Sequence, residues 1–150
     1  MREILFRGKN IDLEWVEGDL LQNGVDYKTA IRTNKEGLVE RVISHTVGQY
    51  TGLTDKNGKK IFEGDILHFK AYQGGGFACP IGTDIYYRVL FGDCNPDMDT
   101  LTEYVGFWAL GKNYDEDDLY EYGNSISYLV SSHSACVIGN IHDNTELIEM

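Results

Sequence analysis

Alternating oxygen-bearing side chains form the pattern in this chain that most resembles a reactive site. They stand at Asp93, Asn95, Asp97 and Asp99. Calcium loops use such alternation to surround a hard cation. However, Met98 stands where an EF-hand loop needs glycine, and Glu103 falls one place short of the bidentate acid that closes such a loop. Short alternations around a proline are more often solvated turns between strands, so we assign no metal site here.

Three further patterns are incomplete as chemical sites. The glycines at positions 74–76 lack the Gly-Lys-Ser/Thr sequence of a phosphate loop. Ser131 and His133 pair a hydroxyl with an imidazole, but no nucleophile elbow surrounds them. His133 and Cys136 have the spacing of metal ligands, while the remaining cysteines, Cys79 and Cys94, lack a pairing motif. The sequence therefore predicts no catalytic residue, no metal and no cofactor, which favours a protein that is not an enzyme.

The overall composition favours one folded domain in a reducing compartment. A chain of 150 residues with 42% hydrophobic residues has enough apolar surface for a core. The three cysteines are odd in number and widely spaced, which disfavours a disulfide framework. No apolar run approaches the length of a membrane span, and the first residues lack a signal-peptide core. We expect a cytoplasmic protein that contacts no membrane.

Charge is distributed very unevenly along the chain. Residues 1–75 hold eleven Lys/Arg and eleven Asp/Glu, whereas residues 76–150 hold only Arg88 and Lys112 against thirteen acids. Because such an excess repels phosphates, we expect no direct contact with nucleic acid, unless the basic groups of the first half gather on one face. The simplest role of the excess is solubility.

One short stretch combines acids with aromatic side chains and is our candidate for protein binding. Lys112 is the only base nearby. Carboxylates steer a basic partner, while tyrosines add amphipathic contact area. The alternative is a solvated loop that only keeps the protein soluble. The candidate residues are Tyr114, Asp115, Glu116, Asp117, Asp118, Tyr120, Glu121 and Tyr122.

The elements that would position these residues are predicted to be mainly strands. Period-two or short apolar segments occur at 86–91, 104–110, 127–130 and 135–138. Helical signals are short, at 26–32 and 115–122, with one further turn beginning at Asn144. The expected core contains Leu53, Ile66, Phe91, Phe107, Trp108, Val137 and Ile138.

The most specific pattern is Gln49-Tyr-Thr-Gly-Leu53 followed by Asp55-Lys-Asn-Gly58 and Glu63-Gly-Asp-Ile66. It predicts two strands around a type I′ turn at Asn57-Gly58. Glu-Gly-Asp also occurs at residues 17–19, and each copy predicts a sharp bend before a strand. Together with 1–9, 14–20 and 137–141, these residues resemble the YopX family of phage and prophage proteins.

The resemblance implies a small barrel of the SH3 type and carries no established biochemical activity. We therefore predict a mainly β fold with little helix, as one domain over residues 1–150. An N-terminal β segment would span about 1–46 and the barrel about 47–150. The resemblance also implies a bacterial host.

Two classes of function follow from these observations. The first is a non-catalytic phage or prophage accessory protein that binds a protein of the phage or of its host. The second is a small-molecule-binding protein or an enzyme whose site is built from dispersed residues. A deep cleft with converging carboxylates or histidines would favour the second class. Self-association stays open.

Overall fold

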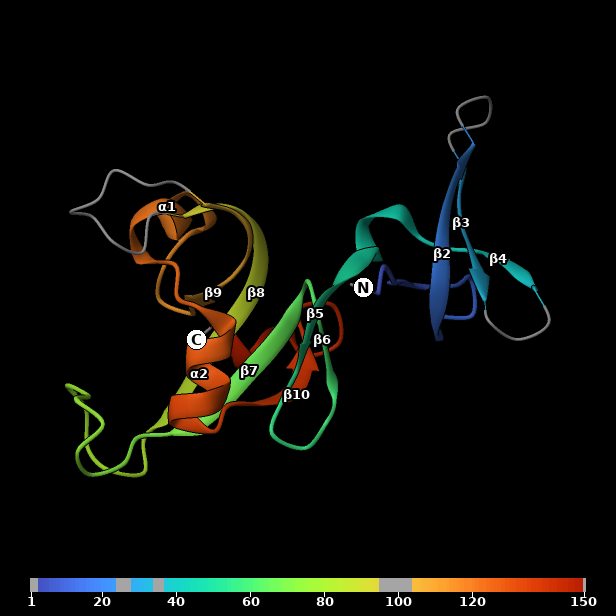
Figure 1. Cartoon of the computed structure of the whole chain (residues 1–150). Coiled ribbons are helices and arrows are strands. Elements are labelled where there is room, and N and C mark those ends of the chain that lie inside the picture. The colour runs from blue at the N-terminus through green and yellow to red at the C-terminus, as the bar shows by residue number, and fades with distance from the viewer. Residues whose placement is uncertain (1–2, 24–27, 34–36, 95–103, 150) are drawn as a thin grey trace. The chain divides into compact units, whose positions relative to one another are not determined.

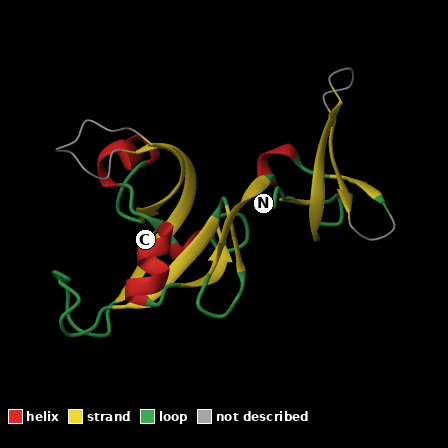
Figure 2. Ribbon diagram, viewed as in Figure 1, coloured by secondary structure: helices red, strands yellow, loops and turns green. Residues whose placement is uncertain are grey.

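The computed structural model describes residues 3–23, 28–33, 37–94 and 104–149 (Figure 1). The chain divides into two compact units, unit 1 at residues 1–52 and unit 2 at residues 53–150. Most of the described elements are strands (Figure 2), so the predicted mainly β class is confirmed. None of the described helices has the length and apolar character needed to cross a membrane. The predicted Asp93–Asp99 cation loop lies largely outside the described residues.

Unit 1 is an antiparallel sheet with one 3-10 turn, η1 (Ser44–Thr46). Its strands occur in the order β4-β3-β2-β1-β5. After β4 the chain returns to the end of β1, where Ile43 N donates to Lys9 O at 2.8 Å and Asn10 forms an isolated bridge with Val42. The strands are β1 (Phe6–Lys9), β2 (Trp15–Asn23), β3 (Lys28–Thr33), β4 (Val39–Arg41) and β5 (Gly48–Thr54).

Buried apolar residues and one closely packed glycine explain how this sheet packs. Ile31 is fully buried, and Val42 and Tyr50 are nearly so. Gly18 pairs with Phe6 on one side and Thr33 on the other. A Cβ at Gly18 would lie 1.9 Å from the Arg32 carbonyl oxygen, so only glycine fits. The first Glu-Gly-Asp copy is therefore the middle of a strand, and the predicted bend there is wrong.

Unit 2 contains a four-stranded antiparallel sheet in the order β10-β7-β8-β9, and the short β6, which lies beside β5 in the other sheet. Its strands are β6 (Lys60–Phe62), β7 (Asp65–Lys70), β8 (Asp84–Cys94), β9 (Tyr104–Gly111) and β10 (Cys136–Asn140). Its helical elements are η2 (Glu116–Asp118), α1 (Leu119–Tyr122), α2 (Ile126–His133) and η3 (Thr145–Leu147). In the described residues the strands form open sheets, so the SH3-type barrel is not closed.

The core of unit 2 lies between α2 and the sheet. Its buried members are Ile61, Leu67, Phe69, Val89, Ala109, Ile126, Leu129, Ala135 and Val137. Of the predicted core, Ile66 and Val137 are buried, Leu53 and Phe107 pack against the cluster, and Trp108 is half-buried.

Two predicted core residues are exposed instead. Ile138 is 42% exposed because it follows the buried Val137 along β10 and so points to the opposite face, next to a register shift between Val137 and Gly139. Phe91, near the end of β8, is 56% exposed and touches the edge of the Phe107 ring at a centroid distance of 5.2 Å. Strand alternation does not predict the register shift in β10, and it does not predict where along β8 the core ends.

Two elements differ in type from the prediction. Residues 127–130 lie in α2, because Ser125 caps the helix by accepting from Tyr128 N at 3.3 Å, and Ile126 and Leu129 share its buried face. Residues 28–32 lie in β3, where pairing with β2 overrides the local helical signal. The predicted turns at 115–122 and after Asn144 are confirmed as η2 with α1 and as η3.

The signature hairpin is built around the carboxylate of Asp55, which is 5% exposed. Its Oδ1 accepts from Asn57 N and Lys59 N, each at 2.9 Å. Gly58 N donates to Asp55 O, and of the two predicted turn residues only Gly58 has a positive φ, 80°. A type I′ turn needs two such residues, so the predicted turn type is wrong although its position is right.

The same carboxylate joins this hairpin to β10. Asp55 Oδ2 accepts from Val137 N at 3.0 Å, across 82 positions of sequence. Burial raises the pKa of the Asp55 carboxyl, but the bonds from the Val137, Lys59 and Asn57 backbones outweigh burial and lower its pKa overall. The ionised form is thus favoured in the folded protein.

A second aspartate fixes the next turn. Asp65, 1% exposed, accepts from Phe62 N through Oδ2 at 2.8 Å. Between them Gly64 adopts φ 90°, donates to Val89 O and accepts from Ile141 N. The second Glu-Gly-Asp copy therefore forms the predicted bend before a strand.

We expect Asp55→Asn to lower the free energy of unfolding at pH 7 by about 1–3 kcal/mol, because an amide offers one acceptor oxygen for three backbone N–H groups. The folded pKa lies below the unfolded value of about 3.9, so the ionised form stabilises the fold above that pH. This contribution is lost as pH falls through the folded pKa. Urea unfolding from pH 7 to pH 3 should show the wild-type advantage shrink below about pH 4. An advantage that is constant with pH would contradict the role of charge.

We expect Phe107→Ala to lower the free energy of unfolding by about 3 kcal/mol, since its ring packs against the core of unit 2. Phe91→Ala is the matched control, because it removes the same atoms from an exposed position on the neighbouring strand. Its expected cost is about 1 kcal/mol, the value of an aromatic pair. Thermal or urea unfolding of both variants measures the difference, and equal costs would contradict this assignment of the core.

Candidate functional site

All eight predicted binding residues lie in the acidic-aromatic segment, which we define as residues 114–122. It follows β9 and consists of a turn, η2 and α1. The three tyrosines are 39–45% exposed, and the carboxylates of Asp115, Glu116, Asp117 and Glu121 are also exposed. Asp118 is half-buried. The segment is thus an ordered part of unit 2 that presents acids and aromatic rings to solvent.

Two interactions hold the segment against the sheet, and two more hold it together internally. Arg88 Nη2, from β8, donates to Tyr114 O at 2.7 Å. The rings of Tyr114 and Tyr122 stack at a centroid distance of 4.5 Å, which brings the two ends of the segment together. Leu119 is 7% exposed, and a Cβ at Gly92 of β8 would lie only 2.9 Å from it. Glycine at position 92 therefore allows α1 to approach the strand.

The fourth interaction distinguishes the acids that stabilise the segment itself from the acids whose carboxylates have no such local role. Asp118 Oδ2 accepts from Asp115 N at 2.9 Å, which caps the first turn of η2. Acids at a helix start are also favoured by the exposed N–H groups there. Asp115 and Asp118 thus have a local structural role, whereas the carboxylates of Glu116, Asp117 and Glu121 are free of such a cap.

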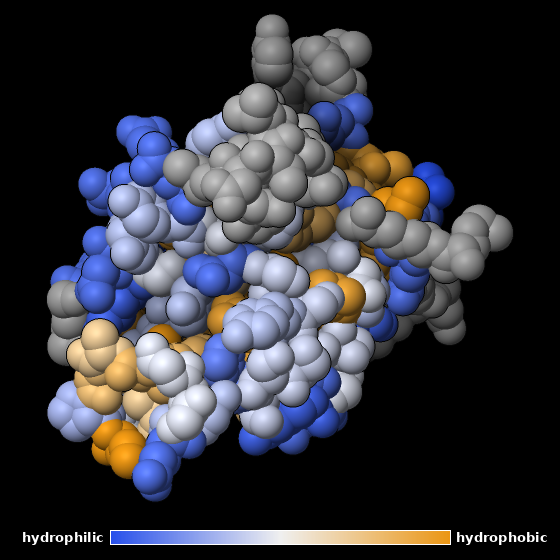
Figure 3. All heavy atoms as spheres, turned by 60° about the vertical axis from the view of Figure 1, so that its left-hand side comes forward, coloured by the Kyte–Doolittle hydropathy of each residue, from blue (hydrophilic) through white to orange (hydrophobic). Residues whose placement is uncertain are grey.

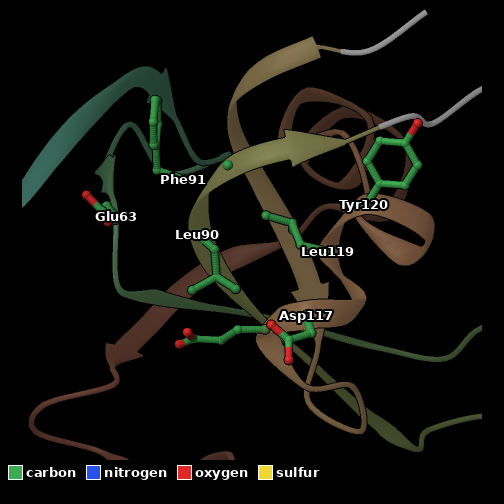
Figure 4. Close-up of a pocket in the computed structure, with 8 residues that line it drawn as sticks. Glu63, Leu90, Phe91, Asp117, Leu119 and Tyr120 are labelled. Carbon is green, nitrogen blue, oxygen red and sulfur yellow. The ribbon is translucent and has the colours of Figure 1, made fainter. Parts of the chain in front are cut away.

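A pocket of about 440 Å³ opens beside this segment (Figure 4). Leu90 points from β8 toward the side where Asp117 lies, and Leu119 points toward β8, with Tyr120 beyond it. Its lining residues are Glu63, Leu90, Phe91, Gly92, Glu116, Asp117, Leu119 and Tyr120. The volume lies within the range of small-molecule sites.

Only part of this pocket was predicted from the sequence. Glu116, Asp117 and Tyr120 line it, while the other five predicted residues lie outside its lining. The contributions of β8 and of Glu63 were missed, because they come from distant stretches of sequence. Phe91 is exposed because of its place in the lining of the pocket. No pattern in the sequence predicts this exposure.

The charged residues that line the pocket are all acidic. Three carboxylates line it, and no basic residue is among the described lining residues. Arg88 is on the same face of β8 two residues before Leu90, but its guanidinium is bound to the Tyr114 carbonyl. In unit 2 as a whole, six Lys/Arg stand against sixteen Asp/Glu. The pocket therefore favours cations over anions.

The other motifs do not assemble into reactive sites within the described residues. His133 stacks on Phe69 at 4.9 Å and its Nδ1 lies 2.8 Å from the Tyr72 hydroxyl, so it belongs to an aromatic cluster. Cys94 is buried, and burial raises the pKa of its thiol. No group of three or more His, Cys, Asp or Glu with metal-holding geometry occurs in the described part of the chain.

Two other parts of the described surface differ from this pocket. Hydrophilic residues cover most of the face shown in Figure 3, and hydrophobic ones reach it only in small separate groups. In unit 1, the guanidinium of Arg7 and the ammonium of Lys9 lie over the Trp15 ring, at 4.7 and 5.5 Å from its centroid. The acids Glu17 and Asp19 alternate with Trp15 along the same strand. This surface is therefore of mixed charge.

Comparison with known proteins gives a family and a fold. The family model described as YopX protein matches residues 5–76. The crystal structure of protein EF1440 from Enterococcus faecalis is similar, with 23% identity and a TM-score of 0.56, over 99% of this chain and 100% of that chain. At this identity the likeness concerns the fold alone. No curated protein matches the chain. The match over residues 5–76, which contain the signature hairpin and its two buried aspartates, supports an assignment of the chain to the YopX family.

Proposed function

We propose that this protein is a non-catalytic binding module that recognises a basic surface of a protein partner through its acidic-aromatic segment. The observation that carries the proposal is the arrangement of that segment. Its carboxylates and tyrosines are exposed together, while Arg88, Leu119 and the Asp118 cap hold the backbone in place. A preorganised surface loses less conformational entropy on binding than a mobile loop does.

The two residue types have different roles in this proposal. The carboxylates attract a basic partner and set its orientation, and the strong negative charge of unit 2 extends this attraction beyond contact distance. The tyrosines supply contact area with few rotatable bonds. Phosphate-bearing nucleic acids would be repelled by the same field, so the partner is a protein.

The resemblance to the YopX family bears on where this interaction would take place. A resemblance to phage and prophage proteins favours a partner from the phage or from its bacterial host, met in the cytoplasm. Self-association is compatible with the same surface only if a second copy presents a basic face. The balanced charge of residues 1–75 leaves that possibility open.

A second candidate function is binding of a small molecule, and the pocket is the observation that favours it. Converging carboxylates in a cleft are the feature that distinguishes this class from a plain protein-binding surface. The lining offers carboxylates and one tyrosine hydroxyl, without histidine, cysteine or serine. A ligand held there would be bound by charge and apolar contact.

We expect capture of the partner to depend on Glu116, Asp117 and Glu121. The test variant is Glu116→Gln, Asp117→Asn and Glu121→Gln, which leaves the Asp118 cap intact. The control variant removes three charges from exposed acids outside the segment, Asp12, Glu14 and Glu146. Capture from host lysate, quantified by mass spectrometry and repeated with the purified partner, should be strong for wild type and control and weak for the test variant.

Added salt should weaken this capture, since screening shortens the range of charge interactions from about 10 Å at 0.1 M to about 3 Å at 1 M. Circular dichroism would show whether both variants remain folded. Equal capture by the test and control variants at low salt would leave the segment as a solubilising surface and overturn the proposal.

A further inference from the structure

The pocket beside the acidic-aromatic segment has walls of two chemical kinds. Leu90 and the buried Leu119 supply apolar side chains beside β8, and Phe91 and Tyr120 also belong to the lining. Glu63, Glu116 and Asp117 supply carboxylates from two stretches of chain that are far apart in sequence. An apolar wall next to carboxylates matches a ligand that has an apolar stem and a cationic end.

We propose that this pocket binds one lysine or arginine side chain of the protein partner. This inference rests on the proposed function and names the group that the partner inserts. Lysine and arginine bury their methylene stems against apolar surface while the charged end stays near water. Here the stem would lie between Leu90 and Leu119, and the cationic end would meet Glu116 and Asp117.

Other ligand classes fit this pocket less well. An anion would meet three carboxylates with no base in the lining. An uncharged apolar ligand would cover carboxylates without pairing them, which costs free energy. A divalent cation needs converging ligands, and the described residues contain no such group of three.

Two details of the pocket support a single side chain as the ligand. Phe91 belongs to the lining and is 56% exposed, so the pocket is open to solvent at this strand. Arg88 is held by the Tyr114 carbonyl at 2.7 Å, so the protein's own nearby cation is already committed elsewhere. The volume of about 440 Å³ leaves room for water around the cationic end.

The test is an amide-detected NMR titration of the full chain with small blocked amino acids. The probes are the Nα-acetyl methylamides of lysine, arginine and norleucine, together with n-pentylamine. Norleucine retains an apolar stem without the charge, and pentylamine retains stem and charge without the peptide groups. We expect lysine and arginine to shift the amide signals of residues 90–92 and 116–120, with norleucine and pentylamine binding more weakly.

Matched charge variants give the second measurement. Glu116→Gln with Asp117→Asn should weaken lysine binding about four-fold, since each screened ion pair contributes a factor of about two. Glu146→Gln with Glu149→Gln removes the same charge from exposed positions outside the pocket and should leave binding unchanged.

Three results would overturn the inference: norleucine binding as well as lysine, shifts confined to other residues, or equal weakening by the two charge variants. Pentylamine binding as tightly as the lysine derivative would also overturn it, in favour of a free amine as the ligand. If these titrations fail while partner capture still depends on Glu116, Asp117 and Glu121, this inference falls and the proposed function stands. If capture fails as well, both fall.

Discussion

Three backbone N–H groups converge on the carboxylate of Asp55, and they come from two places that the chain must bring together. Two belong to the turn after β5, and the third belongs to Val137 of β10. A buried carboxylate is unfavourable unless its lone pairs are satisfied, so the hairpin and β10 are stable only in each other's presence. β10 in turn pairs with β7, whose first residue is the equally buried Asp65. Turn geometry, strand order and core closure in unit 2 therefore depend on this interaction.

The fold built on these aspartates also determines where charge is free to act. Asp55, Asp65 and Asp118 each accept hydrogen bonds from backbone N–H groups, so their carboxylates stabilise local structure. The carboxylates of Glu116, Asp117 and Glu121 remain at the surface, beside a strand that carries Gly92 where α1 must approach closely. Acidic residues thus stabilise the fold at one set of positions and form the proposed recognition surface at another.

The family match and the candidate site concern different parts of the chain. Residues 5–76 contain most of unit 1, the signature hairpin and Glu63, whereas the acidic-aromatic segment and most of the pocket lie beyond them. A shared hairpin therefore carries no information about the charge of the pocket in other family members. The likeness to EF1440 extends over the whole chain but, at 23% identity, it concerns backbone arrangement rather than side chains.

The sequence by itself determined the mainly β class, the position of the Asp55–Gly58 turn and the candidate segment at 114–122, because these follow from local residue types and short spacings. Only the tertiary structure decided that residues 28–32 form a strand, that Ile138 points outward at a bulge, and that Phe91 lines a pocket. Strand pairing overrode local preference at β3, and in β10 Ile138 lies on the face opposite to the buried Val137. Glu63 and Leu90 join Glu116 at one pocket only because β8 and the β6–β7 turn meet α1 in space. Such contacts between distant stretches depend on how whole strands pair, and no local pattern of residues encodes them.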